Sequence, residues 1–218
     1  MEDILNQIAN CIEKGKSDLN SPFPPEMKGL EGAYELTRKA LDNNIHPEVI
    51  LKKAFMVGMS NIGEKFEKGI AFIPNLLLSA KAMNTAMEHL QPFFDSGEAK
   101  LRGTLVIGTV KGDLHDIGKN IVKMVMKGDG WNVIDLGVRV ESEKFLNEIK
   151  NHEKCIVGLS ALLTTTMMNM GEIIKAIKSE SNGIEVFVGG AALSKQFADD
   201  IGADGFFPEP HSFAKHFH

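Results

Sequence analysis

The sequence predicts a chain of two parts, an all-α bundle over residues 1–95 and a doubly wound α/β domain over residues 96–218. Up to about residue 95, apolar residues recur with the period of amphipathic helices, and no strand-like alternation occurs. After the segment DSGEAKLRG at 95–103, short β-branched runs alternate with helical stretches. Such an alternation is typical of a parallel sheet covered by helices on both faces.

Four helices are expected in the first part, with short breaks between them. The prolines of SPFPPE at 21–26 end the first helical pattern, because proline interrupts a helix. Pro47 and Pro74 suit the first turns of the third and fourth helices, which EKG at 67–69 separates. Short connections of this kind favour a small bundle. The expected helices span about 4–12, 29–41, 47–66 and 74–90.

Five strands are expected in the second part. Continuously apolar runs such as TLVIGTV are typical of parallel strands that are buried on both faces. Five such runs in so short a stretch match the smaller, flavodoxin-like (Rossmann-like) doubly wound sheet. The expected strands are 104–110, 131–137, 155–160, 184–190 and 204–208. The expected helices are 117–125, 142–149 with Ser142 as its cap, a methionine-rich helix ending at Ile177, and 191–201.

The composition is that of an ordinary globular protein, with 43% hydrophobic and 24% charged residues. A net charge of −5 without a basic stripe argues against a nucleic-acid partner. Cys11 and Cys155 lie far apart, so a disulfide is improbable and a reducing cytoplasm fits best. The acidic N-terminus does not resemble a signal peptide, and no apolar run approaches the roughly 20 residues that span a bilayer. We therefore expect a cytoplasmic protein with no membrane partner.

Three unusual loops follow predicted strands. Ligands of open parallel sheets bind beyond the carboxyl ends of the strands, at the point where the strand order reverses. GDLHDIG at 112–118 follows the first strand, Ser160 and the threonines at 164–166 follow the third, and GGAA at 189–192 follows the fourth. Because these loops meet at one edge of the sheet, we expect the functional site there.

His115 is the most informative residue of the first loop. A lone histidine is more often a surface or hydrogen-bonded residue than a ligand. Asp113, two residues earlier, could accept from one imidazole nitrogen and leave the other free for a metal. Asp116 better suits capping or solvating the next helix. Gly118 allows either a tight turn or space for a bulky ligand, and Gly189 with Gly190 allows either close helix–strand packing or an open slot.

Other chemistries that use a histidine–aspartate pair lack their further residues. A serine hydrolase would need G-x-S-x-G, and GLSAL at 158–162 lacks the second glycine. A polynuclear metal hydrolase would need further histidine or aspartate ligands, and no H-x-x-x-H pair lies on a predicted helix. The dinucleotide fingerprint G-x-G-x-x-G is also absent. These absences favour a metal that brings its other ligands with it.

Asp113, His115 and Gly118 form a D-x-H-x-x-G motif that resembles the motif of cobalamin-binding domains. SALLTTT at 160–166 and VGGAA at 188–192 match at family-like spacing. GEKFEKGIAFIPNLLLSAKAM at 63–83 resembles the helical cap that precedes this domain in methionine synthase and in corrinoid proteins. The match runs from roughly Glu31 to Phe207. The layout looks like that of the corrinoid proteins that serve methanol, methylamine and methoxyaromatic methyltransferases.

The resemblance implies that the chain binds cobalamin (vitamin B12 or a related corrinoid, including methylcobalamin) in the base-off/His-on mode. His115 would be the lower axial ligand of cobalt and would replace the dimethylbenzimidazole base. Asp113 would hydrogen-bond to His115, and Thr166 would continue that relay. The other implied contacts are Gly118, Ser160, Thr164, Gly189 and Gly190 around the ring and the nucleotide tail, with Phe66 and Ile73 over the upper face.

The function that the resemblance implies is that of a methyl carrier which is not catalytic alone. Its partners would be a substrate:corrinoid methyltransferase, a methylcorrinoid:acceptor methyltransferase that delivers to tetrahydrofolate or a thiol, and a reductive activase. The alternatives are a cobalamin sensor or regulatory module, a mutase or cobalamin-loading module, and a flavodoxin-like domain that binds no cobalamin. Arg139, the SPFPPE segment and the aromatic tail PEPHSFAKHFH depart from the family pattern and leave the docking surface open. The sequence also leaves the methyl donor open among methanol, methylamine, methoxyaromatic compounds and betaine.

Overall fold

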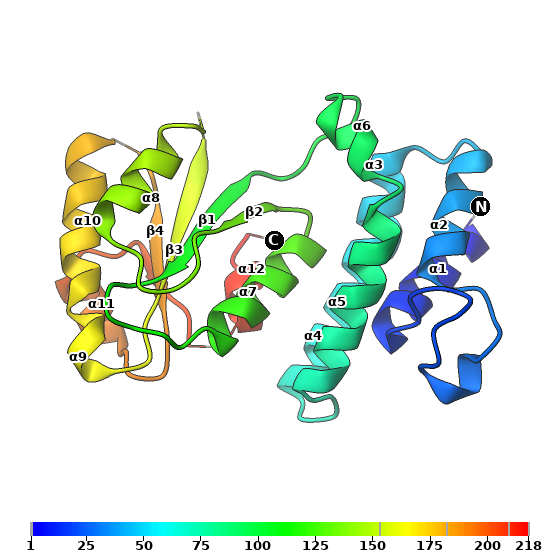
Figure 1. Ribbon diagram of the computed structural model, residues 1–218, viewed down its shortest axis with the longest axis horizontal. Helices are drawn as coiled ribbons and strands as arrows, with labels where there is room; N and C mark the ends of the chain where they lie inside the picture. Colours follow the sequence, from blue (N-terminus) through cyan, green and yellow to red (C-terminus); the bar gives the residue numbers. More distant parts are fainter. Residues whose placement is uncertain (1, 153, 182, 209, 218) are drawn as a thin grey trace. The chain divides into compact units, whose positions relative to one another are not determined.

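The computed structural model describes residues 2–152, 154–181, 183–208 and 210–217 (Figure 1). The chain forms two compact units. One comprises Met1–Leu101 with Gly128–Gly130, and we call it the helical unit. The other comprises Arg102–Lys127 with Trp131–His218, and we call it the α/β unit. None of the helices in the described ranges is long and apolar enough to cross a bilayer.

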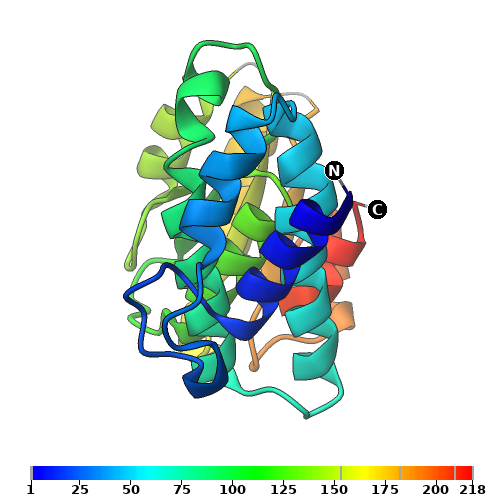
Figure 2. The same cartoon turned by 90° about the vertical axis from the view of Figure 1, so that its right-hand side faces the viewer.

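The helical unit is a bundle whose main helices pack around a shared apolar core (Figures 1 and 2). Ile8, Ile12, Ile50, Phe55 and Met83 are among its fully buried side chains. The four expected helices are confirmed, and SPFPPE holds only a short 3-10 turn, Pro25–Met27. The helices are α1 (Glu2–Lys14), α2 (Ala33–Asp42), α3 (Pro47–Ile50), α4 (Met56–Glu67), α5 (Ile73–Met87) and α6 (Gln91–Asp95).

Local hydrogen bonds explain where two of these helices begin. The Glu35 side chain accepts from the Gly32 N–H at 2.9 Å, which satisfies a free donor at the start of α2. Pro47 opens α3 without losing a helical hydrogen bond, because the first N–H groups of a helix have no partner within it. The predicted third helix contains a π-helical turn, Leu51–Phe55, between α3 and α4. The short helix α6 was not expected from the sequence.

The α/β unit contains five parallel strands in the order β2-β1-β3-β4-β5. This is the flavodoxin-like order, with the reversal point between β1 and β3, so the expected sheet is confirmed. The central strands β1 and β3 are almost entirely buried, as their continuous apolar runs require. The strands are β1 (Thr104–Thr109), β2 (Asn132–Asp135), β3 (Cys155–Ser160), β4 (Val186–Gly189) and β5 (Gly205–Phe206).

Helices cover both faces of this sheet. Helices α7 (Ile117–Gly128) and α12 (Pro210–Lys215) lie on one face, and α8 (Ser142–Ile149) and α10 (Asn169–Glu180) lie on the other (Figure 1). Phe145 of α8 and Met170 of α10 are fully buried in the core of the second face, which also contains side chains of β1, β3 and β4. The remaining helices are α9 (Thr164–Met167) and α11 (Lys195–Asp200).

Three details of these helices differ from the expectation. Ser142 does not cap α8: it is the first helical residue, and Glu141 before it makes no side-chain capping bond. The helix expected at 191–201 begins only at Lys195, because Ser194 caps it by accepting from the Phe197 N–H at 3.2 Å. The methionine-rich helix is divided into α9 and α10. Helix α12, in the aromatic tail, was not expected.

Candidate functional site

The loop that carries His115 joins β1 to α7 and is fixed by its own hydrogen bonds. Gly112 has φ +80°, a conformation that glycine adopts without strain. The Thr109 hydroxyl donates to the His115 carbonyl at 3.0 Å, and the Asp113 N–H donates to the Val110 carbonyl at 3.1 Å. These bonds place the His115 side chain at the carboxyl edge of the sheet with 48% of its surface exposed.

A fully buried carboxylate, that of Asp113, orients this histidine. Asp113 Oδ1 lies 2.7 Å from His115 Nδ1 and also accepts from the His115 N–H at 2.9 Å. Asp113 Oδ2 accepts from the Thr166 hydroxyl at 2.6 Å and from the Leu162 N–H at 2.8 Å. The hydrogen bonds expected among Asp113, His115 and Thr166 are therefore present. Because a carboxylate only accepts, Nδ1 carries the hydrogen of the neutral ring, and Nε2 is then the nitrogen with a free lone pair.

The same contacts determine the charge of Asp113. Burial alone would raise the pKa of this carboxyl, because it removes the charged form from water. The hydrogen bonds from Thr166, His115 and Leu162 outweigh burial and hold the pKa well below its usual range. Asp113 is thus a permanent acceptor for His115 at physiological pH.

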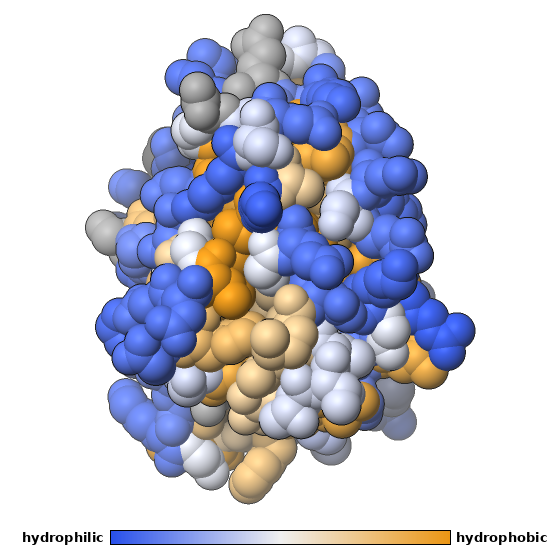
Figure 3. Space-filling model, turned by 90° about the vertical axis from the view of Figure 1, so that its left-hand side faces the viewer, coloured by the Kyte–Doolittle hydropathy of each residue, from blue (hydrophilic) through white to orange (hydrophobic). Residues whose placement is uncertain are grey.

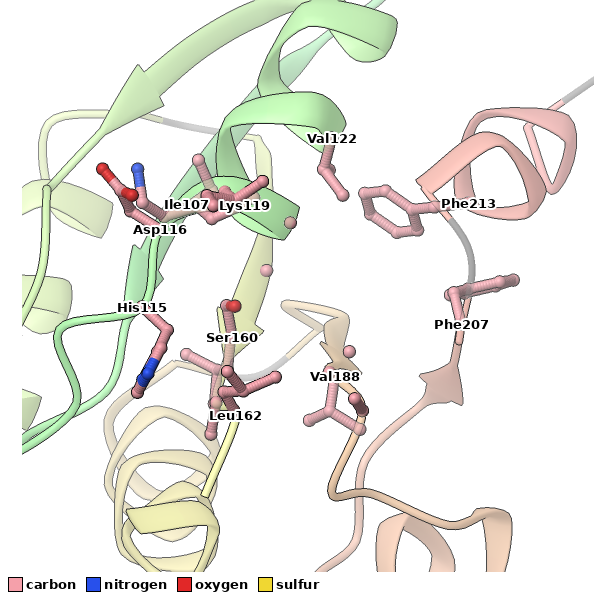
Figure 4. Close-up of a pocket in the computed structure, with 18 of the residues that line it drawn as sticks. Ile107, His115, Asp116, Lys119, Val122, Ser160, Leu162, Val188, Phe207 and Phe213 are labelled. Carbon is pink, nitrogen blue, oxygen red and sulfur yellow. The ribbon is translucent and has the colours of Figure 1, made fainter. Parts of the chain in front are cut away.

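A cavity of about 490 Å³ opens beside this relay, between the carboxyl ends of the strands and the helices α7 and α12 (Figure 4). His115, Gly118, Ser160, Gly189 and Gly190 all line it, so the structure brings these five candidate residues together. The other lining residues are mostly apolar. They include Ile107, Leu114, Ile117, Val122, Leu159, Leu162, Phe187, Val188, Phe207 and Phe213.

Three glycines of the cavity lining differ in whether the structure would accept a side chain in their place. Gly190 has φ +140°, and a Cβ there would lie 1.8 Å from the Ala161 carbonyl oxygen, so close packing excludes any side chain. A Cβ at Gly189 would lie 3.0 Å from the Phe207 carbonyl oxygen, which is also tight. A Cβ at Gly118 would meet nothing within 4 Å, and Gly118 lies within helix α7. Neither packing nor backbone conformation requires glycine at 118, and the open space beside it borders the cavity.

Five other candidate residues lie outside the cavity lining. Asp113 and Thr166 stand behind His115 in the relay. Thr164 is exposed at the first position of α9 and is not among the lining residues. Phe66, half-buried near the end of α4, and Ile73, 40% exposed at the start of α5, belong to the helical unit. Asp116, expected to cap or solvate the next helix, does line the cavity; it precedes α7 and accepts from the Asn120 amide at 3.0 Å.

An ion cluster that was not expected from the sequence anchors α7 to β2. The Lys119 ammonium, on a side chain only 2% exposed, donates to Asp135 Oδ1 at 2.6 Å, and Lys123 donates to Oδ2 at 2.9 Å. Burial raises the pKa of Asp135, but the hydrogen bonds from the two lysines outweigh it and lower the pKa to about 2. The cluster holds in place the helix whose first turn carries Gly118.

Exposed apolar side chains surround the mouth of the cavity. Leu114 is 54% exposed and Ile117 67%, on either side of His115, and Leu162 is 41% exposed. Met168, which is outside the cavity lining at the junction of α9 and α10, is 60% exposed. In Figure 3, apolar side chains gather over the lower end of one face of the α/β unit, where α9 lies. Apolar surface of this kind around a polar centre is typical of a binding site for a large organic ligand.

Part of the cavity was missed by the sequence reasoning. Val122 on α7, Phe187 on β4, and Phe207 and Phe213 near the C-terminus form much of its apolar wall. Phe213 lies in the aromatic tail, and the unusual composition of that tail is the signal in the sequence that points to it. Only the packing of α12 onto the sheet reveals that Phe213 reaches the cavity.

Comparison with known proteins gives consistent matches over both units. Residues 103–214 match the family described as B12 binding domain, and residues 30–91 match a second family with the same description. Trimethylamine corrinoid protein 1 of Methanosarcina acetivorans is 40% identical over 178 residues, which cover 80% of this chain and 82% of that protein. Dimethylamine corrinoid protein 3 of the same organism is 38% identical over 206 residues, which cover 94% of this chain and 90% of that protein.

Solved structures agree with these matches. A chain of the methanol:cobalamin methyltransferase complex MtaBC from Methanosarcina barkeri is similar with a TM-score of 0.81 and 28% identity. The match covers 98% of this chain and 77% of that one. A cobalamin-binding protein from Desulfitobacterium hafniense DCB-2 is similar with a TM-score of 0.73 and 29% identity, over 98% of this chain and 96% of that one.

Proposed function

The chain belongs to the family of corrinoid proteins with B12 binding domains, and from this premise we propose that it carries a methyl group between two methyltransferases. Its cofactor is a corrinoid, and it is a corrinoid protein of a methyltransferase system. When bound, the corrinoid supplies the cobalt atom to which the methyl group is attached. The observation that carries the proposal is the Asp113–His115–Thr166 relay beside a large cavity at the carboxyl edge of the sheet.

The residues present fit a corrinoid held by a single protein ligand. His115 Nε2 is the ring nitrogen that Asp113 leaves available, so it would be the lower ligand of cobalt in the base-off/His-on mode. The exposed side chains of Leu114 and Leu162 offer apolar surface around that nitrogen for a flat ring. The open space at Gly118 and the cavity next to it offer room for the nucleotide tail.

Each of the remaining candidate residues would have a limited task. Ser160 and Thr164 would contact the nucleotide tail, and Gly189 with Gly190 would line its slot. Asp113 and Thr166 would keep the His115 ring in one orientation and one tautomer. In the helical unit, Phe66 and Ile73 would shield the upper face of the ring from water. Ile70 and Phe72, which are 67% and 65% exposed near Ile73, add to the apolar surface available for this.

The partners would be separate proteins. One methyltransferase would load the methyl group, a second would deliver it to an acceptor such as tetrahydrofolate or a thiol, and a reductive activase would restore the cobalt. Relatives are named for trimethylamine and dimethylamine, and one similar structure is of a methanol:cobalamin methyltransferase complex. The donor would accordingly be a small compound with a methyl group on nitrogen or oxygen, chosen by the loading enzyme.

Reconstitution with hydroxocobalamin tests the proposal. The chain should bind it with one-to-one stoichiometry and give the absorption spectrum of base-off, histidine-ligated cobalamin. His115→Ala should abolish the histidine-ligated spectrum, because it removes the only ligand that the relay orients. His152→Ala is a matched control, since His152 pairs with Glu148 on α8 and is outside the cavity lining. An unchanged spectrum in His115→Ala would refute the ligand assignment, and absence of corrinoid binding would refute the function.

A further inference from the structure

The C-terminal segment closes one side of the cavity. Helix α12 follows β5, and its Phe213 is only 4% exposed. Figure 4 shows the Phe213 ring next to Val122 of α7, and both residues line the cavity. Phe207, immediately after β5, also lines the cavity, as does Phe187 of β4. Three phenylalanines from three segments therefore form a continuous aromatic wall.

Contacts between aromatic rings hold this wall together. The ring centroids of Phe187, Phe207 and Phe213 lie 5.2–5.8 Å apart, with interplanar angles of 53–62°. Tilted and edge-to-face pairs at such distances are the favoured aromatic geometry. Phe217 packs against Phe213 at 5.4 Å and against Trp131 at 4.8 Å, which supports the wall from behind. A ligand would meet a surface that is already formed.

The chemistry of the lining favours an apolar aromatic group. The aliphatic side chains of Ile107 and Val122 also line the cavity. Of the four polar side chains in the lining, Asp116 is bonded to Asn120, Lys119 to Asp135, and His115 to Asp113 through Nδ1 alone. The fourth, the Ser160 hydroxyl, could serve one polar atom of a ligand. A flat, hydrocarbon-rich ring would lose few hydrogen bonds to water when it enters the cavity. A ring that carries an amino group and several ring nitrogens would leave polar atoms without partners.

We propose that Phe207 and Phe213 select the nucleotide base of the corrinoid, favouring benzimidazole over adenine and over a corrinoid without a base. The inference rests on the proposed function, because it assumes that His115 takes the place of the base at cobalt. The displaced base then enters the cavity and stacks against the aromatic wall. Selectivity for the base thus lies in the C-terminal aromatic segment of this chain.

Titration of the full chain with three corrinoids tests the proposal. Cobalamin carries benzimidazole, its adenine analogue carries the more polar base, and cobinamide carries no nucleotide; each Kd follows from the change in absorption. The wild type should bind cobalamin at least about tenfold more tightly than either of the others. Phe213→Ala should weaken cobalamin binding by about tenfold or more and change cobinamide binding by less than about threefold.

Two further variants distinguish a loss of preference for the base from a loss of folding. Phe213→Leu keeps an apolar side chain in the core, so it should fold and should lose part of the preference for cobalamin. Phe197→Ala is the matched control, because Phe197 on α11 packs against the other core of the α/β unit and should leave all three affinities unchanged.

Two results would overturn the proposal: a wild type that does not distinguish the three corrinoids, or Phe213 variants that weaken cobalamin and cobinamide equally. A wild type that binds none of the three would instead refute the proposed function itself.

Discussion

Asp113 is the residue on which the geometry of the site depends. Its two oxygens receive hydrogen bonds from the loop after β1 and from the segment after β3, so one buried carboxylate joins both sides of the reversal point. The negative charge is retained because these donors replace water. His115 consequently has one fixed tautomer although nearly half of its surface is exposed.

Thr166 provides the test of this arrangement. Thr166→Val should reduce the free energy of unfolding by about 1–3 kcal/mol, because the buried Asp113 Oδ2 loses its hydroxyl donor. Thr165→Val is the control, since Thr165 is exposed and should change stability by no more than about 0.5 kcal/mol. Urea denaturation measures both. Equal effects of the two substitutions would show that the Thr166 hydroxyl contributes nothing to the relay.

The ion pairs of Asp135 should make the free energy of unfolding depend on pH. Its folded-state pKa of about 2 lies below the unfolded value of about 3.9, so its contribution is complete above about pH 4 and is lost as pH falls toward 2. Asp135→Asn should destabilise the chain by about 3–5 kcal/mol near neutral pH, because it leaves the buried Lys119 unpaired. The difference from wild type should shrink below pH 4.

Denaturant titrations at several pH values measure this dependence. Asp199→Asn serves as the control, since the ion pair of Asp199 with Lys195 is exposed and should contribute at most about 1 kcal/mol at any pH. A difference between Asp135→Asn and wild type that stays constant down to pH 2 would contradict the assigned pKa.

At the scale of elements, the five strands follow from the sequence because buried parallel strands have continuous apolar, β-branched runs. Their order follows from the doubly wound topology that five strands alternating with helices predict. The π-helical turn at Leu51–Phe55 and the short helices α6 and α12 leave no such periodic signal, since tertiary packing determines them. Asp113 and His115 were predictable as a pair because they are two residues apart. Phe213 was not, because only the return of α12 onto the sheet brings it to the cavity.

Substitutions at Gly118 in helix α7 test separately whether a ligand needs the space there and whether glycine affects the stability of the fold. Gly118→Ala should keep or raise the free energy of unfolding, by up to about 1 kcal/mol, since alanine is the better helix former and nothing lies within 4 Å of its Cβ. Gly118→Leu should fold as well but lose most of its corrinoid affinity, because the side chain extends into the cavity. Thermal melts of the apoprotein and corrinoid titrations check the two effects. Normal corrinoid affinity in Gly118→Leu would show that no ligand uses this space.

At the scale of the whole molecule, the chain is two compact units joined by a segment without helix or strand, residues 96–103. A methyl carrier that serves several enzymes needs its cofactor exposed at some times and covered at others. The division of the chain into a helical unit and an α/β unit that holds the cavity is compatible with this need.

The joining segment should therefore be the first site of proteolysis. Lys100 and Arg102 are exposed there, so brief digestion with trypsin should cut after one or both and give two fragments that resist further cleavage. Lys100→Gln with Arg102→Gln should slow this first cut severalfold, whereas Lys175→Gln, on the exposed side of α10, should not. Mass spectrometry of the first products identifies the bond that is cleaved. Early cleavage within α4, α7 or α10 would mean that the units do not behave as separate folded bodies.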